Sequence, residues 1–291
     1  MKRGIWKNIR RAINIPLIIA GFFLSSERLS AQEESKYNFA DHTKVFSVNI
    51  LLNGAISGIG AARNDKPFLE GFAKGALGGF FVASGKYMVA KEGNLAWPAK
   101  IVTSFGTSMA YNISRGRPLL ETLGMEFGPL YLEARGRNID WYLIPGSVAG
   151  IVGGFARGNF SLESTLRYGT PIFYDSLTTE EKPWLRGTTY GFHGSNVLIL
   201  DNNISDEGKN HEIIHSLQAQ TYRNLSSILP APYSKIENFL LRNHIDTRTI
   251  PNGLINHLQN LFLNYGYSLN EWEARVLSGT PSKLDPVLNR N

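Results

Sequence analysis

The chain has 291 residues, which suit one large domain or two small ones, and 43% of them are hydrophobic, which is enough to build a core. Cysteine is absent, and this excludes a disulfide framework, a cysteine-ligated metal and a cysteine nucleophile. The formal charge of +6 is concentrated in residues 1–31, which hold six basic residues and one acidic residue, whereas 24 basic and 23 acidic residues lie in the rest of the chain. This distribution argues against nucleic acid as a partner.

Residues 1–31 have the three parts of a secretory signal peptide. A basic region ends at Arg11, an apolar stretch runs from Ala12 to Leu24, and a polar end leads to Ala31, after which we expect cleavage. The apolar stretch has 13 residues, and a membrane span needs about 20; an uncleaved anchor is the alternative. We therefore expect export, to the periplasm or another part of the cell envelope.

Residues 32–117 are predicted to form a glycine-rich helical region. Segments 45–62 and 68–90 predict a helical hairpin, and a third helix is expected from Pro98 to about Ile113. Small residues recur at every fourth position of the hairpin, where they allow another helix to approach closely: Gly54, Gly58, Ala62, Gly71, Gly75 and Gly79. We favour a tightly packed soluble or membrane-associated pair over a membrane-embedded hairpin, because polar residues interrupt both segments.

Residues 118–291 are predicted to combine a β-sheet with a helical part. From Leu119 the chain is rich in Thr, Tyr, Phe, Val and Ile and punctuated by Gly and Pro, which indicates four to seven strands in a central, mainly antiparallel sheet. Within it, residues 160–167 alternate between apolar and polar side chains, as in a strand. A transmembrane barrel is disfavoured, because alternating segments of ~10 residues are too few. With helices expected at 234–244, 253–264 and 268–279, the predicted fold class is α+β.

The most informative stretch is an H-E-x-x-H pattern, His211-Glu212-Ile213-Ile214-His215, near the start of a predicted helix with Ser205 or Asp206 as its N-cap. On a helix, His211 and His215 share a face and can reach one zinc ion. Glu212 then lies beside the metal, where it can act as a general base toward a water molecule. The alternative is a helix whose histidines only hydrogen-bond to their neighbours.

A catalytic zinc site needs a third protein ligand, and the chain offers His244, His257, Glu271 and Glu273. The H-E-x-x-H stretch, followed by a predicted helix with the sequence Glu-Trp-Glu-Ala at 271–274, resembles the gluzincin class of HExxH zincin metallopeptidases. In several families of that class, the glutamate of a downstream Glu-x-x-Ala completes the zinc site. The resemblance implies Zn²⁺ as cofactor, Glu271 as third ligand, and a peptide or protein substrate. It covers only these two short stretches, assigns no specific family, and departs at Arg275, where some of those families have an acidic residue.

The residues themselves leave alternatives open for this ligand. Glu273 lies among apolar residues of the same predicted helix and is the second choice. Glu271 also completes an S-x-x-E capping box that begins at Ser268, in which it would bond only to the backbone.

Two further roles near the metal are expected, one for His193 or Tyr190 and one for Gln218. His193 lies just before the strand that leads to the H-E-x-x-H helix, and we expect it to stabilise the oxyanion during catalysis; Tyr190 is the alternative donor. Gln218 lies one turn beyond His215 and is expected to orient a ligand.

These patterns predict an exported zinc-dependent hydrolase, a metallopeptidase whose metal ligands are His211, His215 and Glu271, with Glu212 and His193 as catalytic residues. The alternative is a non-catalytic protein of the cell envelope, in which the zincin-like part is a scaffold and the glycine-rich hairpin acts at a membrane or on a partner.

Overall fold

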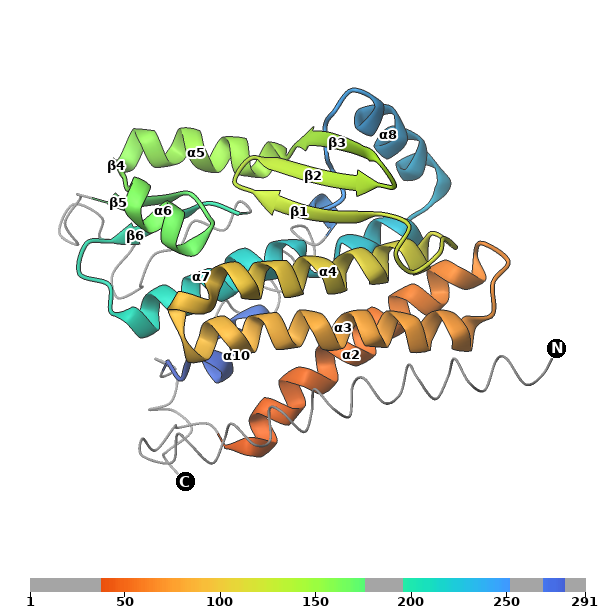
Figure 1. The fold of residues 1–291 in the computed structure, drawn as a ribbon, viewed down its shortest axis with the longest axis horizontal. Coiled ribbons are helices and arrows are strands. Elements are labelled where there is room, and N and C mark those ends of the chain that lie inside the picture. Colours follow the sequence, from red (N-terminus) through yellow and green to blue (C-terminus); the bar gives the residue numbers. More distant parts are fainter. Residues whose placement is uncertain (1–37, 176–195, 252–268, 281–291) are drawn as a thin grey trace. The chain divides into compact units, whose positions relative to one another are not determined.

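Three long helices form one layer of the protein. The computed structural model describes residues 38–175, 196–251 and 269–280. In it α2 (Phe39–Ala62) and α3 (Phe68–Lys91) form a hairpin, and a short turn, η2 (Gly93–Leu95), leads into α4 (Ala96–Ser114). α3 packs against both α2 and α4 (Figure 1). The predicted hairpin and third helix are confirmed.

Glycines let these helices approach until their backbones touch. A Cβ atom on Gly79 would lie 2.3 Å from the backbone oxygen of Asn49 in α2, and one on Gly78 would lie 2.6 Å from the backbone oxygen of Gly106 in α4. Neighbouring glycines on α3 therefore face opposite partners. The predicted fourfold series of Gly71, Gly75 and Gly79 packs on α2, whereas Gly78, which the series did not include, packs on α4.

By length and composition, α2 is the one helix among the described residues that could cross a membrane, and half of its apolar span is buried within the protein. A core helix of a soluble protein has the same properties. This observation is therefore weak evidence for a membrane span.

The strands in the described part of the chain form two small sheets rather than one central sheet. β1 (Leu123–Phe127), β2 (Leu130–Arg135) and β3 (Asn138–Leu143) make an antiparallel meander. β4 (Gly158–Phe160) pairs antiparallel with β5 (Ile172–Asp175), which pairs in parallel with β6 (Leu198–Asp201). The α+β class and the mainly antiparallel pairing are confirmed, whereas the expectation of one central sheet was wrong.

Two segments expected to be strands are helices, α5 (Pro145–Arg157) and α6 (Leu162–Tyr168). The hydroxyl of Ser161 accepts a hydrogen bond from the backbone of Ser164 and caps the start of α6, and Gly169, at a φ of 66°, ends it. The apolar alternation of residues 160–167 was therefore overridden by capping signals at both ends. Burial of an apolar strand face does not favour a strand here, because Phe160 and Leu166 are exposed in the structure.

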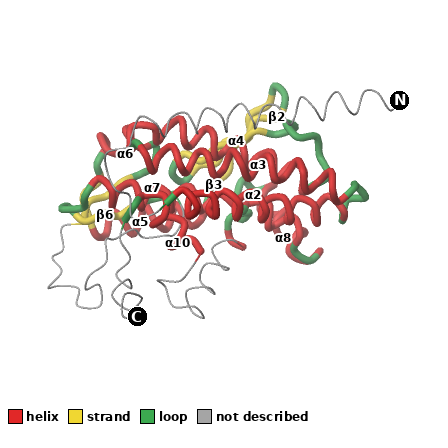
Figure 2. Tube along the Cα trace, turned by 90° about the horizontal axis from the view of Figure 1, so that it is seen from below, coloured by secondary structure: helices red, strands yellow, loops and turns green. Residues whose placement is uncertain are grey.

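Beyond β6, the described segments of the chain are mainly helical, as predicted. It comprises α7 (Asp206–Thr221), the 3₁₀ segment η4 (Arg223–Ile228), α8 (Ala231–Arg242) and α10 (Leu269–Ser278). The helix expected at 253–264 lies outside the described residues. α7 packs on α3, α4 and α10, and α10 also contacts α2 and α3 (Figure 2). The H-E-x-x-H helix is thus held directly against the glycine-rich layer.

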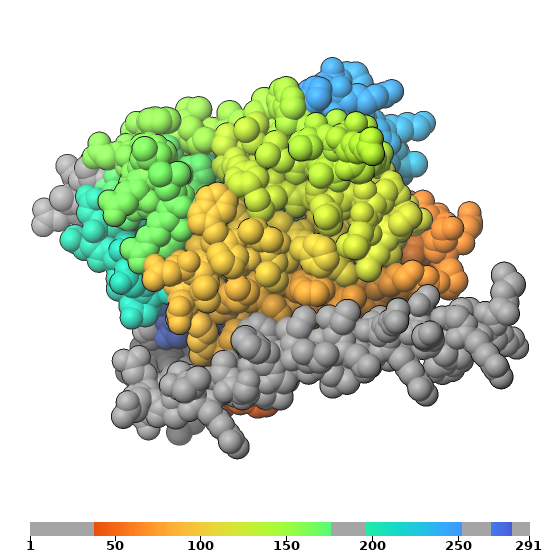
Figure 3. Space-filling view, viewed as in Figure 1, coloured from red at the N-terminus to blue at the C-terminus, as the bar shows by residue number. Residues whose placement is uncertain are grey.

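On the face shown in Figure 3, the side chains of α4 pass without a gap into those of the β1–β3 sheet. The boundary expected between residues 117 and 118 falls in the segment that joins these two elements.

Candidate metal centre

α7 brings the two histidines of the H-E-x-x-H stretch together. Its start is fixed by Ser205, whose hydroxyl accepts a hydrogen bond from the backbone N–H of Gly208 at 3.1 Å, and acidic residues in its first turn complement the helix dipole. One turn apart on the same face, His211 and His215 place their Nε2 atoms 3.0 Å from each other. The N-cap predicted at Ser205 is confirmed.

α10 adds the carboxylate of Glu271 to this pair. Its Oε1 lies 3.2 Å from Nε2 of His215, and its Oε2 lies 3.6 Å from Nε2 of His211. Tetrahedral zinc with bonds of ~2.0 Å holds its ligand atoms about 3.3 Å apart. The distance between the two Nε2 atoms, and the distance from each of them to an oxygen of Glu271, lie close to this value. Among the described residues, His211, His215 and Glu271 are the one His/Asp/Glu group with metal-binding spacing.

The second choice for the third ligand lies elsewhere. Glu273, two residues along α10, forms a buried ion pair with Lys86 of α3. Arg275 lies 3.7 Å from Oε2 of Glu271. The residue that departs from the gluzincin pattern therefore contacts the carboxylate of Glu271 itself. Ser268, the start of the alternative capping box, lies outside the described residues.

Burial and the neighbouring charges set the protonation of this group. Burial lowers the pKa of His211, against the opposing attraction of the Glu271 carboxylate, whose Oε2 lies 3.6 Å from its Nε2. Burial also disfavours a charge on His215, but the hydrogen bond and negative charge of Glu271 outweigh it and raise the pKa of His215. Burial disfavours the charged form of Glu271 too, yet its bonds to the two histidines hold its pKa well below the usual range. An anion and two imidazoles thus converge on one point, as a cation site requires.

Glu212 lies on the same helix and is 3% exposed. Burial raises the pKa of Glu212 to about 7, while His215 acts to lower it and Glu271 to raise it. Its carboxyl group is therefore electrostatically coupled to both of these residues.

Both histidines have hydrogen-bond partners behind the site. Nδ1 of His211 lies 2.9 Å from the hydroxyl of Thr280 and 3.4 Å from that of Ser278. Nδ1 of His215 lies 2.6 Å from Oε1 of Gln218, the residue expected to orient a ligand. The sequence reasoning did not single out Thr280, which has no motif around it.

The remaining candidates divide into two groups. His193, Tyr190 and His257 lie outside the described residues. His244 is far from the metal group in the fold: its ring stacks on Trp141 with centroids 4.6 Å apart, and its Nδ1 lies 2.8 Å from the backbone oxygen of Trp141. His244 therefore has a structural role.

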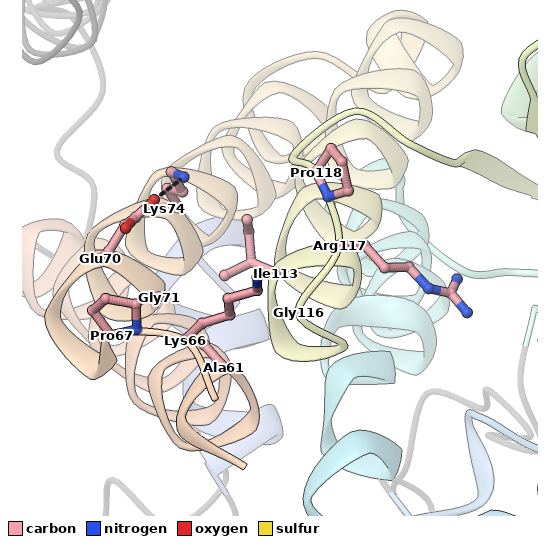
Figure 4. A pocket seen from close by; sticks show the side chains of 10 residues that line it. All are labelled: Ala61, Lys66, Pro67, Glu70, Gly71, Lys74, Ile113, Gly116, Arg117 and Pro118. Carbon is pink, nitrogen blue, oxygen red and sulfur yellow. Dashed lines mark hydrogen bonds and ion pairs between the residues drawn. The ribbon is translucent and has the colours of Figure 1, made fainter. Parts of the chain in front are cut away.

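A surface pocket of about 370 Å³ lies between the end of α2, the start of α3 and the turn after α4, with Lys66, Ile113 and Arg117 in its lining (Figure 4). None of its lining residues belongs to the His/Glu group. The pocket therefore identifies no substrate cleft for that group.

No protein-family model, curated protein or solved structure matches this chain. Its function is therefore inferred from its own residues.

Proposed function

We propose that the protein is an exported zinc-dependent hydrolase, a metallopeptidase, in which His211, His215 and Glu271 hold the metal. The observation that carries this proposal is the convergence of two Nε2 atoms and a carboxylate at separations of 3.0 to 3.6 Å. The H-E-x-x-H sequence supports it, because it places Glu212 beside the two histidines.

The chemistry that zinc supplies in such a site is polarisation of the scissile carbonyl and activation of a water molecule. Glu212 accepts a proton from the attacking water, whose oxygen bonds to the carbonyl carbon. When the carbon–nitrogen bond breaks, Glu212 returns this proton to the leaving amine. His193 is the proposed donor to the oxyanion.

Export is part of the same proposal. It rests on the basic, apolar and polar sections of residues 1–31 and on the nearly neutral charge of the remaining chain. We place the protein in the periplasm or cell envelope.

The test compares three variants of the purified full chain after repletion with zinc. His211→Ala and His215→Ala should lose the metal. Glu212→Gln should keep the metal but no longer hydrolyse a peptide library, with cleavage measured by mass spectrometry. A wild-type chain that binds no stoichiometric zinc, or a Glu212→Gln chain that cleaves the library normally, would overturn the proposal.

One observation favours a second function, that of a non-catalytic envelope protein that binds a membrane through its glycine-rich hairpin. Leu51 and Ile59 of α2 are 55% and 45% exposed, and large apolar side chains on an outer face are typical of interaction surfaces. If this is the function, the protein should float with anionic lipid vesicles, and replacing Leu51 and Ile59 by serine should abolish this flotation. Glu212→Gln should then keep the full biological activity of the wild type. Failure to float, or loss of activity in Glu212→Gln, would reject it.

A further inference from the structure

The amide of Gln218 can be oriented in only one way. Its Nε2 lies 3.0 Å from the backbone oxygen of Asn270 and 2.7 Å from Oε2 of Glu273. Both neighbours are acceptors, so the NH₂ group must occupy this side and the carbonyl oxygen must face His215.

This orientation selects the tautomer of His215. The Gln218 oxygen, 2.6 Å from Nδ1 of His215, can only accept a hydrogen bond, so Nδ1 carries the proton. In a neutral imidazole the other nitrogen then has a free lone pair. That nitrogen, Nε2, is the one that faces Glu271 and His211.

The carboxylate of Glu273 is itself fixed by the glycine-rich layer. Nζ of Lys86 lies 2.9 and 3.1 Å from its two oxygens, and Nδ2 of Asn49 lies 2.5 Å from Oε1. Lys86 also donates to Oδ1 of Asn49 at 3.0 Å. Lys86 is 0% exposed and Glu273 is 3% exposed, so water does not compete for these bonds.

We propose that Lys86 and Glu273 are positioning residues of the metal site: they orient the amide of Gln218, which holds His215 in the tautomer that presents Nε2 to zinc. This inference rests on the proposed metal site and extends it. It also gives the glycine-rich layer a role, because α2 and α3 supply Asn49 and Lys86 to the back of the site.

The first experiment measures zinc affinity by competition with a chelating indicator. Glu273→Gln keeps the shape of the side chain but offers Gln218 a donor as well as an acceptor, so the amide of Gln218 can reverse. Lys86→Met removes the cation that fixes the carboxylate of Glu273. Each change should weaken zinc binding by about 10- to 100-fold, as for other groups that orient a metal ligand. With cobalt in place of zinc, the visible bands should keep their positions, because the ligands themselves are unchanged.

Glu237→Gln is the matched control. Glu237 is a buried carboxylate on α8 that forms an ion pair with Arg115, just as Glu273 does with Lys86, but it is bonded to no part of the proposed chain from Lys86 to His215. Its replacement should lower stability to a similar extent and leave zinc affinity unchanged. If Glu273→Gln and Lys86→Met bind zinc within about twofold of Glu237→Gln, the proposal is wrong.

A second readout does not need the metal. In metal-free protein labelled with ¹⁵N-histidine and kept at a pH above the pKa of His215, where the ring is neutral, the His215 signals, assigned by their loss in His215→Ala, should show the Nδ1–H tautomer. Glu273→Gln should shift them toward the Nε2–H tautomer. An unchanged tautomer in Glu273→Gln refutes the positioning role, whereas absence of zinc from the wild-type chain refutes the proposed function. Glu273→Gln, which removes no atom from the core, serves as the test if Lys86→Met does not fold.

Discussion

Replacing Gly79 by alanine tests whether backbone contact between α2 and α3 holds the glycine-rich layer together. In the interior of a helix this change normally stabilises by about 1 kcal/mol. Here the new Cβ would lie 2.3 Å from the backbone oxygen and 2.9 Å from the backbone carbon of Asn49, and also 2.9 Å from Cα of Ile50. Backbone atoms cannot rotate away, so the two helices must separate by roughly 1 Å to restore a van der Waals contact.

Overpacking of this kind costs about 1–3 kcal/mol, and the contact with backbone on the far side places Gly79 at the upper end of that range. After subtraction of the helix-propensity gain, we expect a net destabilisation of about 2 kcal/mol. Urea unfolding followed by circular dichroism measures it as a lower midpoint with an unchanged slope.

Gly153 of α5 is the matched control. It is also in a helix, but a Cβ there would meet nothing within 4 Å. Gly153→Ala should therefore stabilise the protein by about 0.5–1 kcal/mol. A Gly79→Ala chain that is as stable as the wild type, or more stable as expected for Gly153→Ala, would show that backbone contact does not limit the packing of α2 and α3.

Two further predictions concern buried charges. Lys86→Met should lower the free energy of unfolding by about 3–5 kcal/mol, because it leaves the buried carboxylate of Glu273 without its positive partner. In a double-mutant cycle, adding Glu273→Gln should recover much of this loss, and additive losses would contradict the prediction. Burial lowers the pKa of Lys100 from 10.5 to about 8, so between these pH values the unfolded chain binds the proton and the folded chain does not. The free energy of unfolding of the wild type, relative to Lys100→Met, should therefore rise from pH 8 toward pH 10.5 in urea titrations, and a flat or falling difference would refute this.

Local signals were sufficient for much of the fold. The apolar segments 45–62 and 68–90 predicted the two helices of the hairpin, and Ser205 predicted the start of α7, because helix formation and capping depend on residues close together in the chain. The pairing of His211 with His215 follows from the same helical geometry.

Long-range packing decided what the sequence left open. Glu271 and Glu273 are two residues apart on α10 and face different partners, and the docking of α10 determines which of them meets the histidines. That docking includes Lys86, which is 187 residues from Glu273 in the chain. In the sequence, Lys86 was visible only as a polar interruption of an apolar helix.

The separation of the strands into two sheets by α5 could not be predicted from the sequence either. Residues 145–157 are apolar and contain glycine, a composition that suits a buried strand or a helix equally well. Pro145 at the first position of α5 was the available helix signal.

The zinc content of Glu271→Ala, measured beside the wild type by mass spectrometry of the metal after dialysis, tests the three-residue site most directly. We expect about one zinc per wild-type chain and loss of that zinc in Glu271→Ala, because two histidines alone make an incomplete site. A variant that retains as much zinc as the wild type, or a wild-type chain without zinc, would contradict this expectation.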